Sequence, residues 1–146
     1  MISFSMAVWW FTKGSGAGAF DIGIPCDYGY PAEVTTACNA KNDYSSSVKS
    51  REHTRFGYHD GAGYAMTHDG PEEIKWKICK ATRTFPTITF GVAFFDMEFE
   101  DTSESCKHSQ YGHFTYAAGY WRVHNVATYF KSVVKQPDFI QSGPAC

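Results

Sequence analysis

The sequence contains no leucine, so other side chains must form its apolar core. Phenylalanine (12), tyrosine (9) and tryptophan (4) carry most of that load, with valine and isoleucine beside them. Aromatic and β-branched residues favour strands over long helices. Their flat rings could also stack on the apolar faces of sugars, although a ring-rich core is the more common reason for such a composition.

The chain also has little charge of either sign. Charged residues make up 19% of it, the formal net charge is -2, and no basic run occurs. Binding to nucleic acid through phosphates needs clustered lysine and arginine, so we expect no nucleic-acid partner. No apolar run approaches the roughly 20 residues of a membrane-spanning helix, so we expect no membrane partner either.

The cysteines form no Cys-x-x-Cys pair, which argues against a zinc ribbon or a thioredoxin-like motif. Their wide spacing fits one or two disulfides in a secreted protein, with one thiol left over. Reduced, buried cysteines are the alternative. The cysteines are Cys26, Cys38, Cys79, Cys106 and Cys146.

An apolar run covers residues 2–11 and is followed by small residues at 14–19. It is either a signal peptide or a buried strand bounded by a glycine-rich loop. The run lacks a preceding basic region and contains adjacent tryptophans, Trp9 and Trp10, which favours the strand. Because side chains alternate along a strand, these two rings cannot face the same side.

The remaining pattern predicts alternating helices and strands, an α/β arrangement. Residues 33–38 are strand-like, and residues 55–67 predict a strand or hairpin. A helix should begin with Asp69 as its cap, carry Pro71 in its first turn and end before Pro86. A strand at 87–97, apolar on both faces at its centre, and a helix at 119–134 complete the prediction.

The common catalytic and metal motifs are missing from the sequence. It contains neither His-Glu-x-x-His nor Gly-x-Ser-x-Gly, and the glycine-rich residues 14–18 are followed by no lysine or helix. We therefore predict no metal and no cofactor, and we interpret most histidines as turn or surface residues. These are His53, His59, His68, His108 and His113.

Residues 91–101 read Gly-Val-Ala-Phe-Phe-Asp-Met-Glu-Phe-Glu-Asp, and Cys106 follows. This stretch resembles the last barrel strand of family 18 glycoside hydrolases, the chitinases and chitinase-like proteins. Their pattern is Gly-[VA]-x-x-Trp-[SA]-[LIM]-Asp-x-Asp-Asp followed by a disulfide cysteine. Residues 68–77 resemble the family's Tyr-Asp-Asp-x-x-Ser-Ile-x-x-Lys stretch, and residues 30–38 its Ser-Tyr-x-Glu-[IV]-Cys segment. The likeness is strongest to divergent arthropod proteins of the arachnid type.

The resemblance implies a partial (β/α)8 barrel. Residues 3–11 fall where strand seven belongs, residues 12–67 form an α+β insertion, and helix seven, strand eight and helix eight follow. Residues 1–146 would then be a C-terminal fragment of a family 18 barrel. A full barrel takes about 250 residues, and two strands cannot close one. We therefore expect unpaired strand edges and marginal stability.

The sequence departs from the family pattern at the positions that the family uses for catalysis and for holding the sugar. The catalytic motif of strand four, Asp-x-x-Asp-x-Asp-x-Glu, does not occur in the sequence. Family 18 chemistry needs its glutamate as general acid, with the substrate's own N-acetyl group as nucleophile. Phe95 stands where the family has the tryptophan beneath the sugar, and residues 9–11 replace Tyr-Gly-Arg. The chain is therefore not expected to be an enzyme.

The resemblance places several side chains near a bound sugar. The alternative is that the rings belong to the core and that the acids of residues 96–101 are paired or solvated, and taken alone the residues favour this alternative for both the rings and the acids. The resemblance also implies a disulfide between Cys38 and Cys106. It leaves Cys26, Cys79 and Cys146 unassigned, and cysteines that stay free are usually small buried residues. The predicted sugar-contacting residues are Trp9, Phe95, Asp96, Glu98, Tyr58 and Tyr64.

Together these observations predict a secreted, catalytically inactive chitinase-like protein that binds chitin or N-acetylglucosamine oligomers. Two alternatives stay open. The chain could be a secreted effector that uses a chitinase-like scaffold to bind a protein partner, or the non-catalytic end of an active family 18 chitinase.

Overall fold

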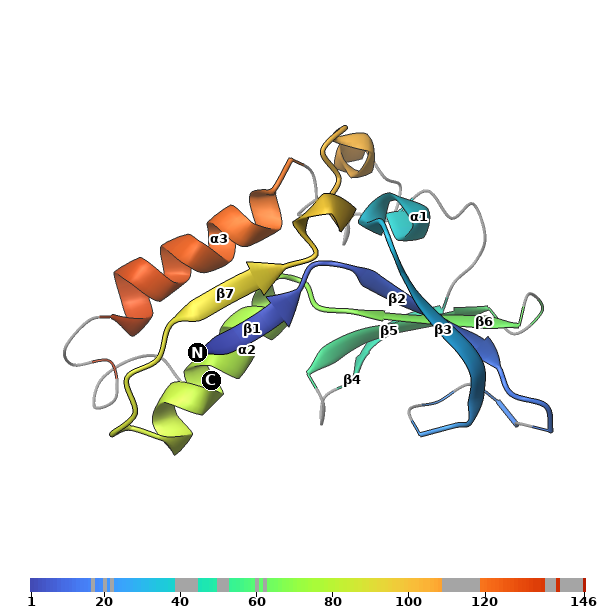
Figure 1. Ribbon diagram of the computed structural model, residues 1–146, viewed down its shortest axis with the longest axis horizontal. Coiled ribbons are helices and arrows are strands. Elements are labelled where there is room, and N and C mark those ends of the chain that lie inside the picture. The colour runs from blue at the N-terminus through green and yellow to red at the C-terminus, as the bar shows by residue number, and fades with distance from the viewer. Residues whose placement is uncertain are drawn as a thin grey trace.

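The computed structural model describes residues 1–16, 18–19, 21, 23–38, 45–49, 53–59, 61, 63–108, 119–135, 139 and 146. Within them the strands form a two-stranded and a five-stranded sheet, which lie side by side. Figure 1 shows the smaller sheet with two helices on one side of the molecule and the larger sheet on the other.

The smaller sheet is a parallel pair of strands, β1 (Ile2–Ser5) and β7 (Val92–Phe95). Helices α2 (Pro71–Thr84) and α3 (Trp121–Tyr129) lie along it, and a π-helical turn at Phe130–Val134 extends α3 (Figure 1). Alternate strand residues such as Phe4 and Phe94 pack into one apolar core with these helices. The other face of the pair carries Ser3, Ser5, Ala93 and Phe95, and no described strand pairs with its outer edges.

The larger sheet is antiparallel, with the order β3-β2-β6-β5-β4. Its strands are β2 (Val8–Lys13), β3 (Cys26–Ala32), β4 (Ser45–Lys49), β5 (Thr54–His59) and β6 (Tyr64–His68). The short helix α1 (Val34–Cys38) covers one face and forms a second core with Val8, Trp10, Met66 and Cys106. The Nε1 of Trp10 donates to the Oγ1 of Thr36 at 3.0 Å, which ties α1 to β2.

The predicted single strand over residues 2–11 is wrong, because the chain changes sheets within it. Met6 still belongs to the first core, and its N–H donates to the carbonyl oxygen of Phe95 at 3.0 Å. Val8 already pairs with Ala32 in the second sheet. The sequence stays apolar across the break because each half is buried in its own core. The five-stranded sheet therefore begins at Val8, before the predicted insertion at residues 12–67.

The prediction for residues 33–38 is also wrong, because these residues form α1 instead of a strand. The backbone N–H and the hydroxyl of Thr36 both donate to the carbonyl oxygen of Glu33, at 3.0 and 2.6 Å. This local hydrogen bonding competes with strand pairing. Val34 and Ala37, one turn apart, then point into the second core.

Most other predicted elements are confirmed with changed ends. The hairpin at 55–67 is β5 and β6, and the last helix is α3 with its extension. Helix α2 begins after Gly70, not Asp69, because Glu73 accepts from the N–H of Gly70 at 2.9 Å while Asp69 pairs with Lys77. The strand expected at 87–97 is limited to β7, since β1 offers only four residues to pair with.

Candidate functional site

The carboxyl end of the parallel pair brings three predicted sugar-contacting residues together. Phe95 ends β7 with 48% of its surface exposed, on the face that the helices do not cover. Asp96 follows in the left-handed region (φ 59°), and its Oδ2 accepts from the Oγ of Ser5 at 2.6 Å. Glu98 is exposed in the 3-10 turn Met97–Phe99. An exposed ring with a half-buried carboxylate beside it suits contact with a hydroxylated ligand.

The two following acids have structural roles instead. Asp101 is fully buried and accepts from the backbone N–H groups of Ser105 and Cys106, at 2.9 and 2.6 Å. Glu100 is buried in an ion pair with Arg122, with 3.0 Å between Oε1 and Nε. The favoured interpretation of the acids as paired or solvated thus fits these two, and it also fits Asp96, which is bonded to Ser5, and Glu98, which is exposed. Only Asp96 and Glu98 are left near the exposed ring of Phe95.

Burial controls the ionisation of Glu100. Removal from water raises the pKa of its carboxyl group above the ordinary value, and the positive charge of Arg122 opposes that rise. The second carboxylate oxygen, Oε2, is buried with no hydrogen-bond partner among the described residues. Glu100 therefore holds its proton more tightly in the folded chain than in the unfolded one.

The other three predicted sugar-contacting residues lie on the five-stranded sheet, on opposite faces. Trp9 pairs with Thr67, and Tyr58 pairs with Ala65, so Trp9 and Tyr58 share the face away from α1. Trp9 is 39% exposed and Trp10 only 6%, which confirms that the two rings face different sides. Tyr64 lies on the α1 face. The six residues therefore do not form one site.

Tyr64 lines a cavity whose residues the sequence did not predict to lie together. It has a volume of about 220 Å³ and is lined by Trp10, Tyr30, Ala32, Thr36 and Tyr64. These residues come from three strands and α1, so only the strand register brings them together. The alternation of aromatic residues in β3 was the one available signal.

The histidines have different surroundings. His53 stacks on Trp76 with ring centroids 3.5 Å apart, and His68 is buried. The side chains of His59 and His108, and the whole of His113, lie outside the described residues. In the part of the chain that the structure describes, no three histidine, cysteine or acidic side chains gather as a metal site would require.

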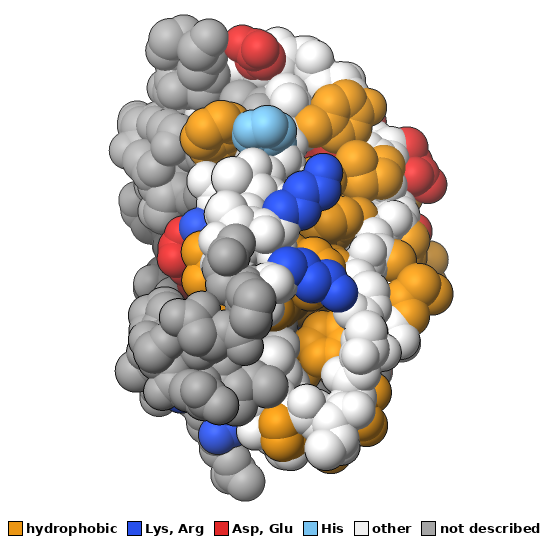
Figure 2. Space-filling model, turned by 90° about the vertical axis from the view of Figure 1, so that its left-hand side faces the viewer, with side chains coloured by type: hydrophobic (Ala, Val, Ile, Leu, Met, Phe, Trp, Pro, Cys, Tyr) orange, Lys and Arg blue, Asp and Glu red, His pale blue; other side chains and the backbone are white. Residues whose placement is uncertain are grey.

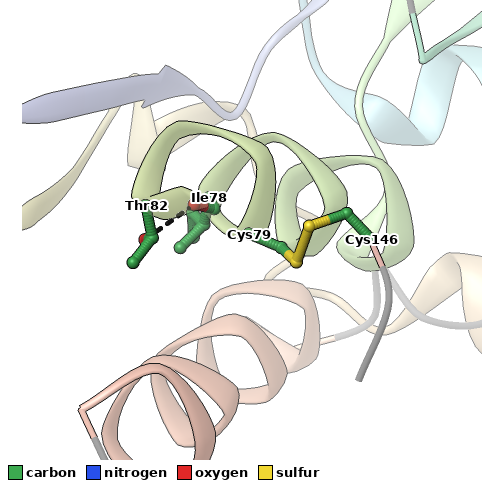
Figure 3. The surroundings of a disulfide bond; sticks show 4 residues. All are labelled: Ile78, Cys79, Thr82 and Cys146. Atoms are coloured by element: carbon green, nitrogen blue, oxygen red, sulfur yellow. Dashed lines mark hydrogen bonds between the residues drawn. A yellow bond between two sulfur atoms is a disulfide. The ribbon is translucent and has the colours of Figure 1, made fainter. Parts of the chain in front are cut away.

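One disulfide is described, between Cys79 of α2 and Cys146 (Figure 3). The sequence left the pairing of Cys79 and Cys146 open, because nothing in the spacing of the cysteines singled out this pair. Cys26 is an exposed free thiol. Cys106 is buried with its Sγ 3.9 Å from the carbonyl oxygen of Val34 in α1. The side chain of Cys38 lies outside the described residues, so the pair Cys38–Cys106 stays a prediction.

Comparison with known proteins places this geometry in a fold. No protein-family model and no curated protein sequence matches the chain. An immunomodulatory active chitinase from Trichuris suis matches in structure with a TM-score of 0.58 and 14% identity, over 80% of this chain and 34% of that one. Human YKL-39, described as a pseudo-chitinase with retained chitooligosaccharide binding, matches with a TM-score of 0.59 and 9% identity, over 86% and 34%.

A catalytic domain of an Ostrinia furnacalis Group II chitinase, solved with an N-acetylchitooligosaccharide, matches with a TM-score of 0.53 and 11% identity, over 75% of this chain and 34% of that one. The chain thus spans about a third of the length of these structures. Identities this low show the fold alone. The chain has a mixed α/β fold similar to part of chitinase and chitinase-like structures, which confirms the resemblance at that level. No helix among the described residues has the length and apolar character of a membrane span.

Proposed function

We propose that this chain is part of a chitinase-like (β/α)8 barrel that binds N-acetylglucosamine oligomers without hydrolysing them. In this assignment β1 and β7 are barrel strands seven and eight, α2 and α3 are the helices that follow them, and the five-stranded sheet with α1 is the insertion. The parallel register of β1 and β7, with both helices against one face, supports it.

The exposed ring of Phe95 is the observation that carries the sugar-binding proposal. It lies at the carboxyl end of β7, and barrel proteins place their sites at the carboxyl ends of the strands. The hydrogen bond between Ser5 and Asp96 holds the neighbouring carboxylate in place across the two strands. A pyranose could stack on the ring while a hydroxyl group donates to Asp96.

Two observations argue against hydrolysis by this chain. The strand-four motif is absent from its sequence, and Glu100 and Asp101 are occupied by buried structural contacts. The disulfide between Cys79 and Cys146 supports an oxidising, extracellular setting.

Binding of chitotetraose to the purified chain, measured by calorimetry, tests the proposal. We expect Phe95→Ala to weaken binding about tenfold, from loss of ring stacking. Phe85→Ala is the matched control, because Phe85 is similarly exposed (54%, against 48% for Phe95) but lies before the start of β7. A fluorogenic chitobioside should show no turnover. Absence of any chitotetraose binding, or cleavage of the chitobioside, would contradict the proposal.

A further inference from the structure

A row of tyrosines crosses the α1 face of the five-stranded sheet. Thr12 of β2 pairs with Tyr28 on one side and Tyr64 on the other, so both tyrosines share its face. Adjacent strands lie about 4.8 Å apart, which puts the two tyrosine backbones about 10 Å from each other. Tyr28 is 63% exposed and Tyr64 38% exposed.

The next row along the same strands supplies the floor between them. Trp10 pairs with Tyr30 and with Met66, one pleat away from Thr12. The rings of Tyr28 and Tyr30 stack with their centroids 5.8 Å apart. Trp10 and Thr36 both line the cavity of about 220 Å³, and the hydrogen bond between them holds Trp10 in place. We call Tyr28, Tyr30, Tyr64 and Trp10 the tyrosine platform.

The chemistry of the platform defines its ligand. The cavity lining contains aromatic rings, a methyl group and hydroxyl groups, with no charged side chain among them. Such a surface has nothing to pair with an ionic ligand, whereas rings and hydroxyls match the apolar faces and hydroxyl groups of a neutral pyranose. The hydrogen-bonded strands fix the backbones that carry the rings before binding, which limits the entropy lost on association.

We propose that the tyrosine platform is a second binding site for neutral oligosaccharides, separate from the carboxyl end of β7. It rests on the proposed function only in taking the same class of ligand. The two sites lie on different sheets, so each can be removed without touching the other.

Chitotetraose binding to a set of variants tests this inference. We expect Tyr28→Ala and Tyr64→Ala each to weaken binding at the platform about tenfold, while Tyr28→Phe and Tyr64→Phe, which keep the rings, retain most of the affinity. Near-ultraviolet circular dichroism checks that Trp10 keeps its environment in each variant. Cellotetraose is the comparison ligand for the N-acetyl group.

The outcomes separate the two proposals. Weaker binding in the alanine variants of Tyr28 and Tyr64 supports the platform, whatever Phe95→Ala does. Weaker binding in Phe95→Ala alone, with both tyrosine variants unchanged, overturns the platform and leaves the proposed function standing. Loss of binding in the tyrosine variants alone would instead remove Phe95 from the site. Binding of neither sugar to the native chain overturns both.

Discussion

Arg122 joins three segments that are far apart in the sequence. Its Nε donates to Glu100 after β7, its Nη1 donates to the carbonyl oxygen of Asp69 before α2 at 2.8 Å, and its Nη2 donates to the carbonyl oxygen of Met6 after β1. The side chain is completely buried. It therefore fixes the point at which the first core meets the five-stranded sheet.

Replacing Arg122 by methionine should lower the free energy of unfolding by about 3–5 kcal/mol, because Glu100 is left as a buried charge without a partner. Urea unfolding measures the change, with Lys80→Met on the exposed side of α2 as the control. The double variant Arg122→Met with Glu100→Leu should be more stable than Arg122→Met alone, since both charges are then removed. Equal midpoints for Arg122→Met and Lys80→Met would show that the ion pair is not structural.

The raised pKa of Glu100 predicts a pH dependence of stability. Between its ordinary pKa and its higher folded value, the folded chain keeps a proton that the unfolded chain has lost. The contribution of this group to stability is therefore complete below the ordinary pKa and is lost as the pH rises through the folded pKa. Urea midpoints from pH 4 to 7 should show this loss in the native chain, and Glu100→Gln should remove it. An identical pH profile in both proteins would refute the assignment.

At the scale of the elements, a disulfide links helix α2 to Cys146. Cys79 is 2% exposed on the core side of the helix, and its disulfide partner Cys146 is 67 residues away in sequence. Figure 3 shows the bridge on α2, where Thr82 also donates to the carbonyl oxygen of Ile78 at 2.9 Å. Closing a loop of this length restricts the unfolded chain far more than the folded one.

Loss of this disulfide should lower the free energy of unfolding by about 2–4 kcal/mol. The test compares Cys79→Ala combined with Cys146→Ala against Cys26→Ser, which changes the exposed free thiol only and should leave the unfolding midpoint in place. A double variant as stable as Cys26→Ser would mean that the bridge does not constrain the unfolded chain.

The elements also show what sequence patterns can and cannot predict. Helix α2 and the hairpin β5–β6 followed from local signals, because an acidic first turn, a proline and alternating aromatic residues act over a few positions. The change of sheet at Met6 and Ala7 did not, since both cores demand apolar residues and the run shows no break. The same holds for the binding residues, since only those close together in sequence could be predicted as a group. Phe95 and Asp96 are adjacent in sequence, whereas the residues of the tyrosine platform, from Trp10 to Tyr64, are brought together only by the strand register.

At the scale of the whole molecule, the parallel pair β1–β7 is open at both outer edges and on the face away from the helices, within the described residues. Figure 2 shows hydrophobic side chains gathered on the side of the molecule where β1 and β7 begin. Large exposed apolar residues precede both strands: Met1 (89% exposed) before β1, and Phe85 (54%) and Ile88 (58%) before β7. With no described strand on either outer edge, the pair can accept further strands on both sides.

The isolated 16.4 kDa chain should therefore self-associate as its concentration rises, which light scattering after size exclusion would show. Ser3→Lys with Ala93→Lys puts two charges on the open face of the pair and should reduce association. Thr128→Lys with Ser132→Lys adds the same charge to the exposed side of α3 and should not. If the chain stayed monomeric at every concentration, the open pair of strands with its two helices would not need a partner to remain in solution, and this prediction would be wrong. If both variants reduced association equally, the cause would be the change in net charge and not the open face of the pair.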